Sequence, residues 1–139
     1  MASEAPRVRF AGYAAVFNKL DNGGDVIRPG AFARTLQAGA SVPLLWQHKS
    51  GAVIGRIERI EEDGRGLRVI GSISADERGR WVGTLLQRRS LDGLSFGYRV
   101  RSAERREGHR ELRDLDIVEV SIVSKPMQPL ARVHAVESR

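Results

Sequence analysis

Ser95 is the residue whose surroundings point most directly to chemistry, because it lies in the sequence Gly93-Leu94-Ser95-Phe96-Gly97. The chain contains no cysteine, so covalent catalysis would have to use an oxygen or nitrogen nucleophile. If residues 91–100 form a strand, side chains alternate between its two faces, and Ser95 shares its face with Gly93 and Gly97. The two glycines would then offer an open substrate face beside the hydroxyl. An ordinary strand serine next to a bulge would show the same pattern.

The pattern Gly-x-Ser-x-Gly also occurs at the nucleophile elbow of α/β-hydrolases, where a strand precedes the serine and a helix follows it. Here the residues after Ser95 continue as a strand and then enter a charged turn around Gly108. The context therefore disfavours an elbow, and the serine is expected in the body of a strand.

A serine hydroxyl is a weak nucleophile until a base accepts its proton, and His48 is the first candidate for that base. It follows a predicted strand over residues 42–47 and precedes the turn Lys49-Ser50-Gly51. A histidine at such a junction can direct one nitrogen into a cleft and stay hydrated, which suits general-base catalysis. A plain surface histidine fits the same position. His109 lies in the charged turn, and His134 is a reserve candidate for the base or an orienting group.

Glu119 interrupts the otherwise aliphatic run Ile117-Val118-Glu119-Val120. Burying a carboxylate is costly unless a cation or hydrogen-bond donors meet it. An orienting contact with His48 would satisfy Glu119, because a carboxylate fixes the imidazole tautomer and stabilises the imidazolium. Pairing with an arginine, or exposure to water on an edge strand, would satisfy it equally. The residues alone leave these alternatives open.

The elements that must position these side chains are mostly strands. Strands are predicted over residues 7–17, 42–47, 52–60, 67–74, 91–100 and 112–124, with a possible final strand over 131–136. Short helices are predicted over 31–39 and 76–89. Six or seven strands without βαβ alternation indicate an α+β, mainly β fold, with a mostly antiparallel closed sheet or β-barrel surrounded by short helices. The length predicts one domain over residues 1–139. Residues 1–6 and the last few residues are expected to be flexible.

The net charge of +6 and the isoelectric point near 10.7 raise the question of nucleic-acid binding. The arginines are spread along the chain among acidic residues, and the densest stretch, 99–113, is predicted to be a solvated hairpin. Aromatic residues that could stack on bases are not interleaved with them. Specific nucleic-acid binding is therefore disfavoured, and an acidic protein partner is at least as plausible. We expect no metal or other cofactor, because the three histidines lack helical zinc-site spacing, and no membrane association, because long apolar runs are missing.

Several of these segments occur together in an order that resembles the tailed-phage prohead maturation serine proteases, which are related to the herpesvirus assemblins. The segments cover most of the chain in collinear order: Gly12-Tyr13-Ala14-Ala15-Val16-Phe17, 24–32, Pro43-Leu44-Leu45-Trp46-Gln47-His48, Ile54-Gly55, 91–98, and 118–123 with Pro126. The resemblance implies a herpesvirus-protease-like barrel. It further implies that Ser95 is the nucleophile, that His48 is the base, and that Glu119 is the orienting third member.

Other assignments implied by the resemblance concern residues after Ser95. Asp116 is the fallback for the third member, and Asp114 also lies close in sequence. The oxyanion or substrate loop falls by position on Ser124 and Lys125.

The resemblance also implies substrates, partners and a location. Expected substrates are a capsid scaffold protein or the scaffolding segment of the major capsid protein, together with the protease itself. A homodimer or higher oligomer fits the family, and the expected location is the assembling prohead in the cytoplasm of the bacterial host. Two other functions fit parts of the sequence: a non-catalytic capsid-assembly or scaffolding module and a basic nucleic-acid-binding domain.

Overall fold

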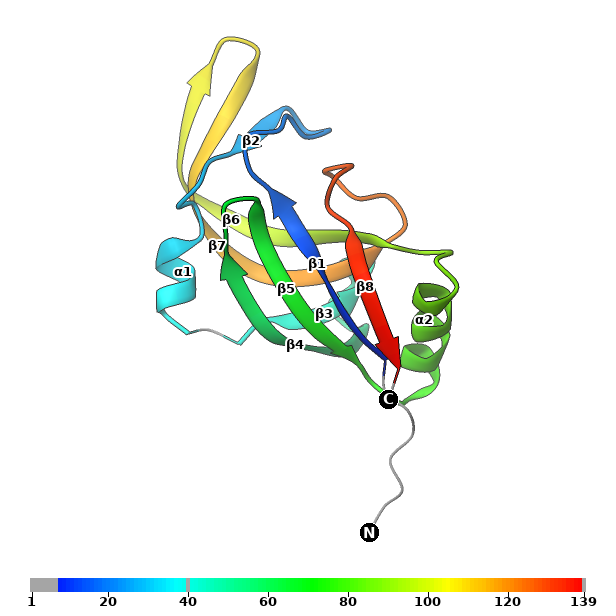
Figure 1. Cartoon of the computed structure of the whole chain (residues 1–139). Helices are drawn as coiled ribbons and strands as arrows, with labels where there is room; N and C mark the ends of the chain where they lie inside the picture. Colours follow the sequence, from blue (N-terminus) through cyan, green and yellow to red (C-terminus); the bar gives the residue numbers. More distant parts are fainter. Residues whose placement is uncertain (1–7, 40, 139) are drawn as a thin grey trace.

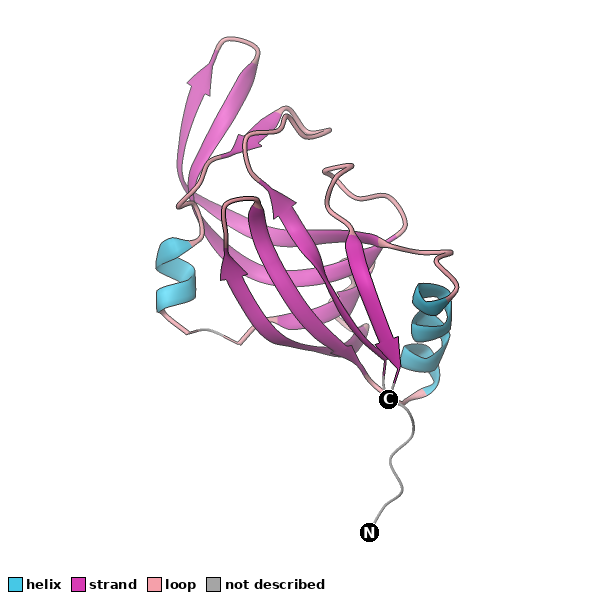
Figure 2. Ribbon diagram, viewed as in Figure 1, coloured by secondary structure: helices cyan, strands magenta, loops and turns pink. Residues whose placement is uncertain are grey.

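The computed structural model describes residues 8–39 and 41–138, which form eight strands and two helices (Figures 1 and 2). The strands are β1 (Val8–Val16), β2 (Asp25–Ile27), β3 (Pro43–Trp46), β4 (Val53–Glu62), β5 (Gly66–Ile73), β6 (Gly93–Arg106), β7 (His109–Val123) and β8 (Val133–Ser138). The helices are α1 (Ala33–Gln37) and α2 (Glu77–Gln87). The flexibility predicted for residues 1–6 lies outside the described residues. At the other end, all described residues from 133 onward belong to β8.

The strands form one curled sheet in the order β2-β7-β3-β4-β5-β1-β8, and β6 pairs with β7 along its whole length, on the edge opposite to β2 and β3 (Figure 2). Most neighbours are antiparallel, whereas β2 and β3 run parallel to β7. Residues 131–133 join the two sides of the curl, because Tyr13 N–H donates to Arg132 O and Leu94 N–H donates to Ala131 O, both at 3.0 Å. The predicted mainly β, mostly antiparallel fold is confirmed. The strand that the prediction missed is β2, whose three residues are too few to show an alternating pattern.

The hydrophobic core fills the inside of this curl. Phe32, at the start of α1, is completely buried, and its ring lies 6.1 Å from that of Phe17 and 5.3 Å from that of Phe96. Leu44, Leu94 and other aliphatic side chains from most of the strands surround these rings. The strand alternation therefore places one large side chain of nearly every strand into a single core.

Helix α2 packs against β4, β5 and β8, and one of its side chains reaches β3, the strand that leads to His48. Asp76 caps the helix by accepting the Gly79 N–H at 2.8 Å, as predicted for a helix starting there. Val82 and Leu86 are fully buried, and Trp81 packs edge-on against Trp46 with ring centroids 5.1 Å apart. The helix thus supports the end of β3. No helix in the described part of the chain is long and apolar enough to cross a membrane.

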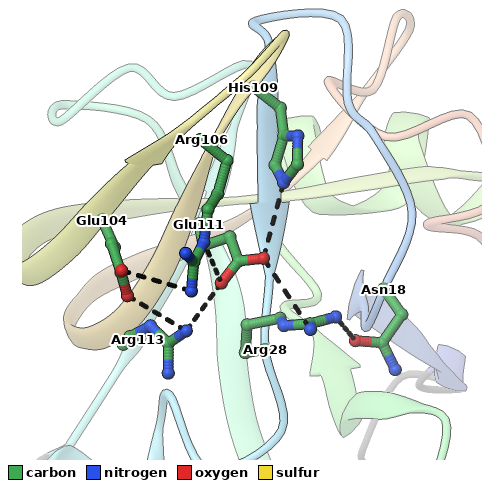
Figure 3. A network of polar contacts seen from close by, with 7 residues as sticks. All are labelled: Asn18, Arg28, Glu104, Arg106, His109, Glu111 and Arg113. Atoms are coloured by element: carbon green, nitrogen blue, oxygen red, sulfur yellow. Dashed lines mark hydrogen bonds and ion pairs between the residues drawn. The ribbon is translucent and has the colours of Figure 1, made fainter.

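The outer half of the β6–β7 hairpin projects from the barrel, as Figure 1 shows in yellow. Its charges are largely paired around Glu111, which is buried although it lies near the hairpin end (Figure 3). The basic neighbours of Glu111 are Arg28, Arg106, His109 and Arg113. Since Arg28 also donates a hydrogen bond to the Asn18 side-chain oxygen at 2.8 Å, this network ties the hairpin to the segment before β2. The hairpin predicted over 99–113 is confirmed.

The backbones of β4 and β5 approach each other closely at Gly55, so a substitution at this position tests the packing between the two strands. A Cβ atom at Gly55 would lie 2.0 Å from the Ser72 carbonyl oxygen, so a backbone shift would be required. We expect Gly55→Ala to lower the free energy of unfolding by at least about 2 kcal/mol in urea denaturation. Gly64→Ala is the matched control, because that position has open space, and its effect should stay within about 0.5 kcal/mol. Equal midpoints for the two variants would contradict this packing.

Candidate active site

The pairing of β6 with β7 brings the candidate residues onto one face of the sheet. Ser95 lies opposite Ser121, and Gly97 lies opposite Glu119. Residues directly opposite in an antiparallel pair point to the same side, as do residues two apart in one strand. On the other side of β7, Leu45 of β3 pairs with Ser121. The end of β3 therefore delivers His48 to the face that carries Ser95 and Glu119.

His48 and Glu119 form a short hydrogen bond. The Nδ1 atom of His48 lies 2.6 Å from Oε1 and 3.2 Å from Oε2 of Glu119. Glu119 is buried, whereas the His48 side chain is 44% exposed. Because a carboxylate accepts, we assign the imidazole proton to Nδ1, which leaves the Nε2 lone pair free. Nε2 makes no hydrogen bond within the described residues, so it is available to accept a proton.

Ser121 fixes both partners of this pair and is completely buried. Its hydroxyl donates to Oε2 of Glu119 at 2.9 Å and accepts the backbone N–H of His48 at 3.0 Å. Ser121 was not among the site residues predicted from the sequence. Its position two residues after Glu119 could have indicated it, because it shares the strand face of Glu119.

The backbone at His48 has an uncommon conformation. Gln47 and His48 have φ values of 52° and 61°, in the left-handed region that non-glycine residues seldom adopt. Such a conformation costs on the order of 1–3 kcal/mol per residue and persists only where surrounding bonds impose it. Here Gln47 N–H donates to Ile122 O at 3.0 Å, in addition to the bond between His48 and Ser121. The turn is thus held in the conformation that presents the imidazole to Glu119.

Ser95 and His48 line the same narrow pocket, whose volume is about 90 Å³. Its other lining residues are Ala14, Asp21, Ile27, Phe96, Tyr98, Met127 and Gln128. Ser95 is only 6% exposed, and its hydroxyl forms no hydrogen bond within residues 8–39 and 41–138. In those residues, every side-chain nitrogen or oxygen atom that solvent cannot reach has a hydrogen-bond partner. Because Ser95 Oγ has none, it must be accessible to solvent. A candidate nucleophile and a candidate base therefore face one cavity.

The two glycines that flank Ser95 do not form an open substrate face, contrary to the prediction. A Cβ atom at Gly97 would lie 3.1 Å from the Glu119 side chain, and one at Gly93 would lie 2.5 Å from Val123 O and 3.0 Å from Pro126. The glycines leave room for the neighbouring strand and for the Glu119 carboxylate. Their small size thus serves the internal packing of the site.

Asp116, the fallback for the third member, lies in a different network. Its carboxylate pairs with Arg34 and Arg101, and hydrogen bonds from these guanidinium groups lower the pKa of Asp116. Asp114 pairs with Arg34 as well. Neither aspartate lines the pocket of Ser95, so the structure brings Glu119 and not Asp116 to His48.

Ser124 and Lys125, which the resemblance assigns to an oxyanion or substrate loop, do not line this pocket. The Ser124 N–H donates to Oε1 of Gln47 and its hydroxyl accepts from Nε2 of Gln47, both at 3.1 Å. Ser124 therefore anchors the turn that carries His48. Residues a little later in the same loop, Met127 and Gln128, do reach the pocket.

The remaining histidines lie elsewhere. His134 is exposed on β8, with its ring 5.4 Å from that of Tyr13, and burial together with the charge of Arg65 lowers its pKa. His109 lies 3.5 Å from Glu111 in the projecting hairpin. Neither lines the pocket of Ser95, and no group of metal-binding side chains occurs among the described residues.

The chain is similar to known proteins both in sequence and in fold. Residues 1–139 match the profile of a family described as caudovirus prohead serine protease. The prohead protease of Enterobacteria phage HK97 is 34% identical over 94 residues, which make up 66% of this chain and 42% of that protein, so the chain spans less than half of this relative.

Two solved structures share the fold. The bacteriophage T4 capsid assembly protease superposes with a TM-score of 0.69 at 12% identity, covering 91% of this chain and 87% of that one. The varicella-zoster virus protease gives a TM-score of 0.60 at 16% identity, covering 95% of this chain and 64% of that one. The predicted herpesvirus-protease-like fold is confirmed by these two likenesses.

Proposed function

Because the chain belongs to the caudovirus prohead serine protease family, we propose that it is a serine endopeptidase of capsid maturation. In this proposal Ser95 is the nucleophile, His48 is the general base and Glu119 orients His48. The observation that supports it most strongly is the 2.6 Å bond between His48 and the buried Glu119, made beside the pocket that Ser95 lines.

The reaction is an acyl transfer in two halves. As the Ser95 hydroxyl oxygen attacks the scissile carbonyl carbon, its proton passes to Nε2 of His48. The tetrahedral intermediate collapses when the C–N bond breaks and Nε2 gives this proton to the leaving amine. Water then attacks the acyl-enzyme, with His48 again taking a proton, and the ester C–O bond breaks to restore the Ser95 hydroxyl.

Glu119 and the loop after β7 assist this reaction in different ways. The carboxylate holds the proton on Nδ1, which keeps Nε2 unprotonated before the attack and stabilises the imidazolium after it. The negative oxygen of the tetrahedral intermediate requires nearby N–H donors. We assign these donors to the loop that supplies Met127 and Gln128 to the pocket, which Gln128 anchors through two 2.8 Å bonds to the Val16 backbone.

For substrates, we propose the capsid scaffold protein or the scaffolding segment of the major capsid protein, and the protease itself. This assignment follows from the family, whose members act in prohead maturation. Co-expression with the capsid and scaffold proteins of the same phage or prophage tests it. Appearance of shortened capsid or scaffold chains supports the assignment, and full-length chains beside an enzyme that cleaves an unfolded reporter protein would contradict it.

The third member is tested by comparing Glu119→Gln with Asp116→Asn. A glutamine can turn its amide nitrogen toward Nδ1 and thereby favour the tautomer that has the proton on Nε2. We expect Glu119→Gln to lower kcat on an unfolded reporter protein by about 10³- to 10⁴-fold. Asp116→Asn makes the same chemical change in an exposed ion-pair network and should leave kcat close to that of the unsubstituted enzyme. A large loss in Asp116→Asn with activity retained in Glu119→Gln would reverse the assignment.

The two other functions fit the structure less well. A non-catalytic module has no need for a buried carboxylate hydrogen-bonded to a half-exposed histidine beside an unpaired serine. A nucleic-acid-binding domain needs arginines that are free to contact phosphates. Many arginines of this chain are instead paired with carboxylates: Arg9, Arg28, Arg34, Arg101, Arg106, Arg110, Arg113 and Arg132.

A further inference from the structure

The pocket beside Ser95 contains a second carboxylate, that of Asp21, which the mechanism does not use. Asp21 is 8% exposed. Its Oδ1 atom accepts the N–H groups of Gly23 at 2.8 Å and of Asp25 at 2.9 Å, which fixes the side chain in the turn before β2. Its Oδ2 atom makes no hydrogen bond or ion pair within the described residues. Because every solvent-inaccessible side-chain oxygen of these residues has a hydrogen-bond partner, the unpaired Oδ2 atom must be accessible to solvent in the pocket that Asp21 lines.

The charge of Asp21 is not neutralised by a bonded cation. The neighbouring Asp25 is paired with Arg110 through two bonds of 2.9 and 3.0 Å. In the region described by the structure, Asp21 has no such partner. The side chains of Asp21, Asp25 and Arg110 therefore comprise two carboxylates and only one guanidinium. The pKa of the Tyr98 phenol, which also lines the pocket, is raised by burial and by the negative charges of Asp25 and Asp21, in spite of Arg110. One negative charge therefore remains at the wall of the pocket.

The rest of the pocket is largely apolar. Ala14, Ile27, Phe96 and Met127 contribute hydrocarbon surface to the pocket that Ser95 and Asp21 also line. The turn that carries Asp21 is fastened to the loop after β7, because Asn22 N–H donates to Met127 O at 3.0 Å. Figure 1 shows these two segments at the same end of the barrel. The carboxylate is thus held at a defined place behind an apolar lining.

We propose that this pocket receives the substrate side chain on the acyl side of the scissile bond and that Asp21 selects lysine or arginine at that position. The apolar part of the pocket lining accommodates the methylene stem of such a side chain, while the Asp21 carboxylate receives its cationic end in a charge-assisted hydrogen bond. An aspartate or glutamate at that position would meet the like charge of Asp21. This inference rests on the proposed function, because it uses Ser95 to define where the scissile bond lies.

The test is a map of cleavage sites in a denatured proteome, obtained by mass spectrometry with a Ser95→Ala background subtracted. The unsubstituted enzyme should show lysine and arginine enriched on the acyl side. Asp21→Asn retains an oxygen acceptor for the Gly23 and Asp25 N–H groups and removes only the charge. It should reduce the ratio of basic to neutral residues at that position by about 10-fold or more, which corresponds to the loss of a hydrogen bond to a charged group. Asp76→Asn, the same change at the start of α2 outside the pocket, should keep the basic preference.

The outcomes separate this inference from the proposed function. Cleavage that depends on Ser95 but shows no preference for basic residues would overturn the inference and leave the protease assignment intact. A basic preference that persists in a folded Asp21→Asn variant would also overturn it. Absence of any cleavage that depends on Ser95 would overturn both proposals. If Asp21→Asn fails to fold, the profile of the unsubstituted enzyme still tests the inference, because absence of a basic preference overturns it.

Discussion

Ser95→Ala should yield a folded protein that no longer hydrolyses peptide bonds. Removal of the nucleophile in serine proteases lowers kcat by a factor on the order of 10⁶, because the acyl-enzyme cannot form. We expect the same loss here in the rate of cleavage of an unfolded reporter protein. Processing of the protease itself should stop as well.

The structure predicts that this loss occurs without unfolding. The Ser95 hydroxyl has no hydrogen-bond partner within the described residues, and an alanine fits the same backbone, so the free energy of unfolding should change by less than about 1 kcal/mol. A serine-directed phosphonate provides the direct measurement. Its adduct should map to the peptide that contains Ser95 and be absent from Ser95→Ala. Proteolysis that persists in a purified Ser95→Ala variant would reject Ser95 as the nucleophile.

Sequence patterns predicted most of the sheet because each long strand carries its own alternating core face. Leu94 and Phe96 are buried as the alternation over 91–100 requires, whereas Val100 is 39% exposed. The reason is that β6 continues past the core into the projecting hairpin, where there is no second layer to cover it. The parallel pairing of β3 with β7 could not be predicted, because it joins strands far apart in the chain.

The site shows the same difference between local patterns, which could be predicted, and long-range pairing, which could not. Glu119 could be recognised locally, since a carboxylate inside an aliphatic run requires a partner. Its partner could not be identified without the pairing of β3 with β7, which brings His48 beside it. Asp21 begins the sequence Asp-Asn-Gly-Gly, which is typical of a turn, and its position in the pocket depends on the bond between that turn and Met127. Long-range pairing, which short patterns do not encode, assembles the site.

The position of Ser121 explains why the β6–β7 pair is suited to this site. Its hydroxyl bridges the His48 backbone and the Glu119 carboxylate, while its backbone lies opposite Ser95. One residue is therefore joined to all three members of the proposed triad. Ser121 is fully buried in a strand with neighbours on both sides, so its two hydrogen bonds are shielded from water.

His48→Asn should abolish activity as completely as the loss of Ser95, and it should do so at little cost in stability. The amide nitrogen of asparagine occupies nearly the place of Nδ1 and can donate to Glu119, but nothing replaces Nε2. Asparagine also tolerates the left-handed backbone found at this position, where φ is 61°. We expect kcat on the reporter protein to fall by a factor on the order of 10⁵ to 10⁶. The remaining rate should rise with pH, because hydroxide then replaces the missing base.

His48→Ala separates the two contributions of the imidazole. It should lose activity to the same extent and should also lower the free energy of unfolding by about 1–3 kcal/mol, because the buried Glu119 carboxylate loses its principal donor. Urea denaturation of the two variants beside their kinetics makes this comparison. If His48 were only a surface residue, both variants would retain activity and neither would be destabilised. A stable His48→Asn variant without activity, beside a less stable His48→Ala variant without activity, requires that one imidazole both satisfies Glu119 and accepts the proton of Ser95.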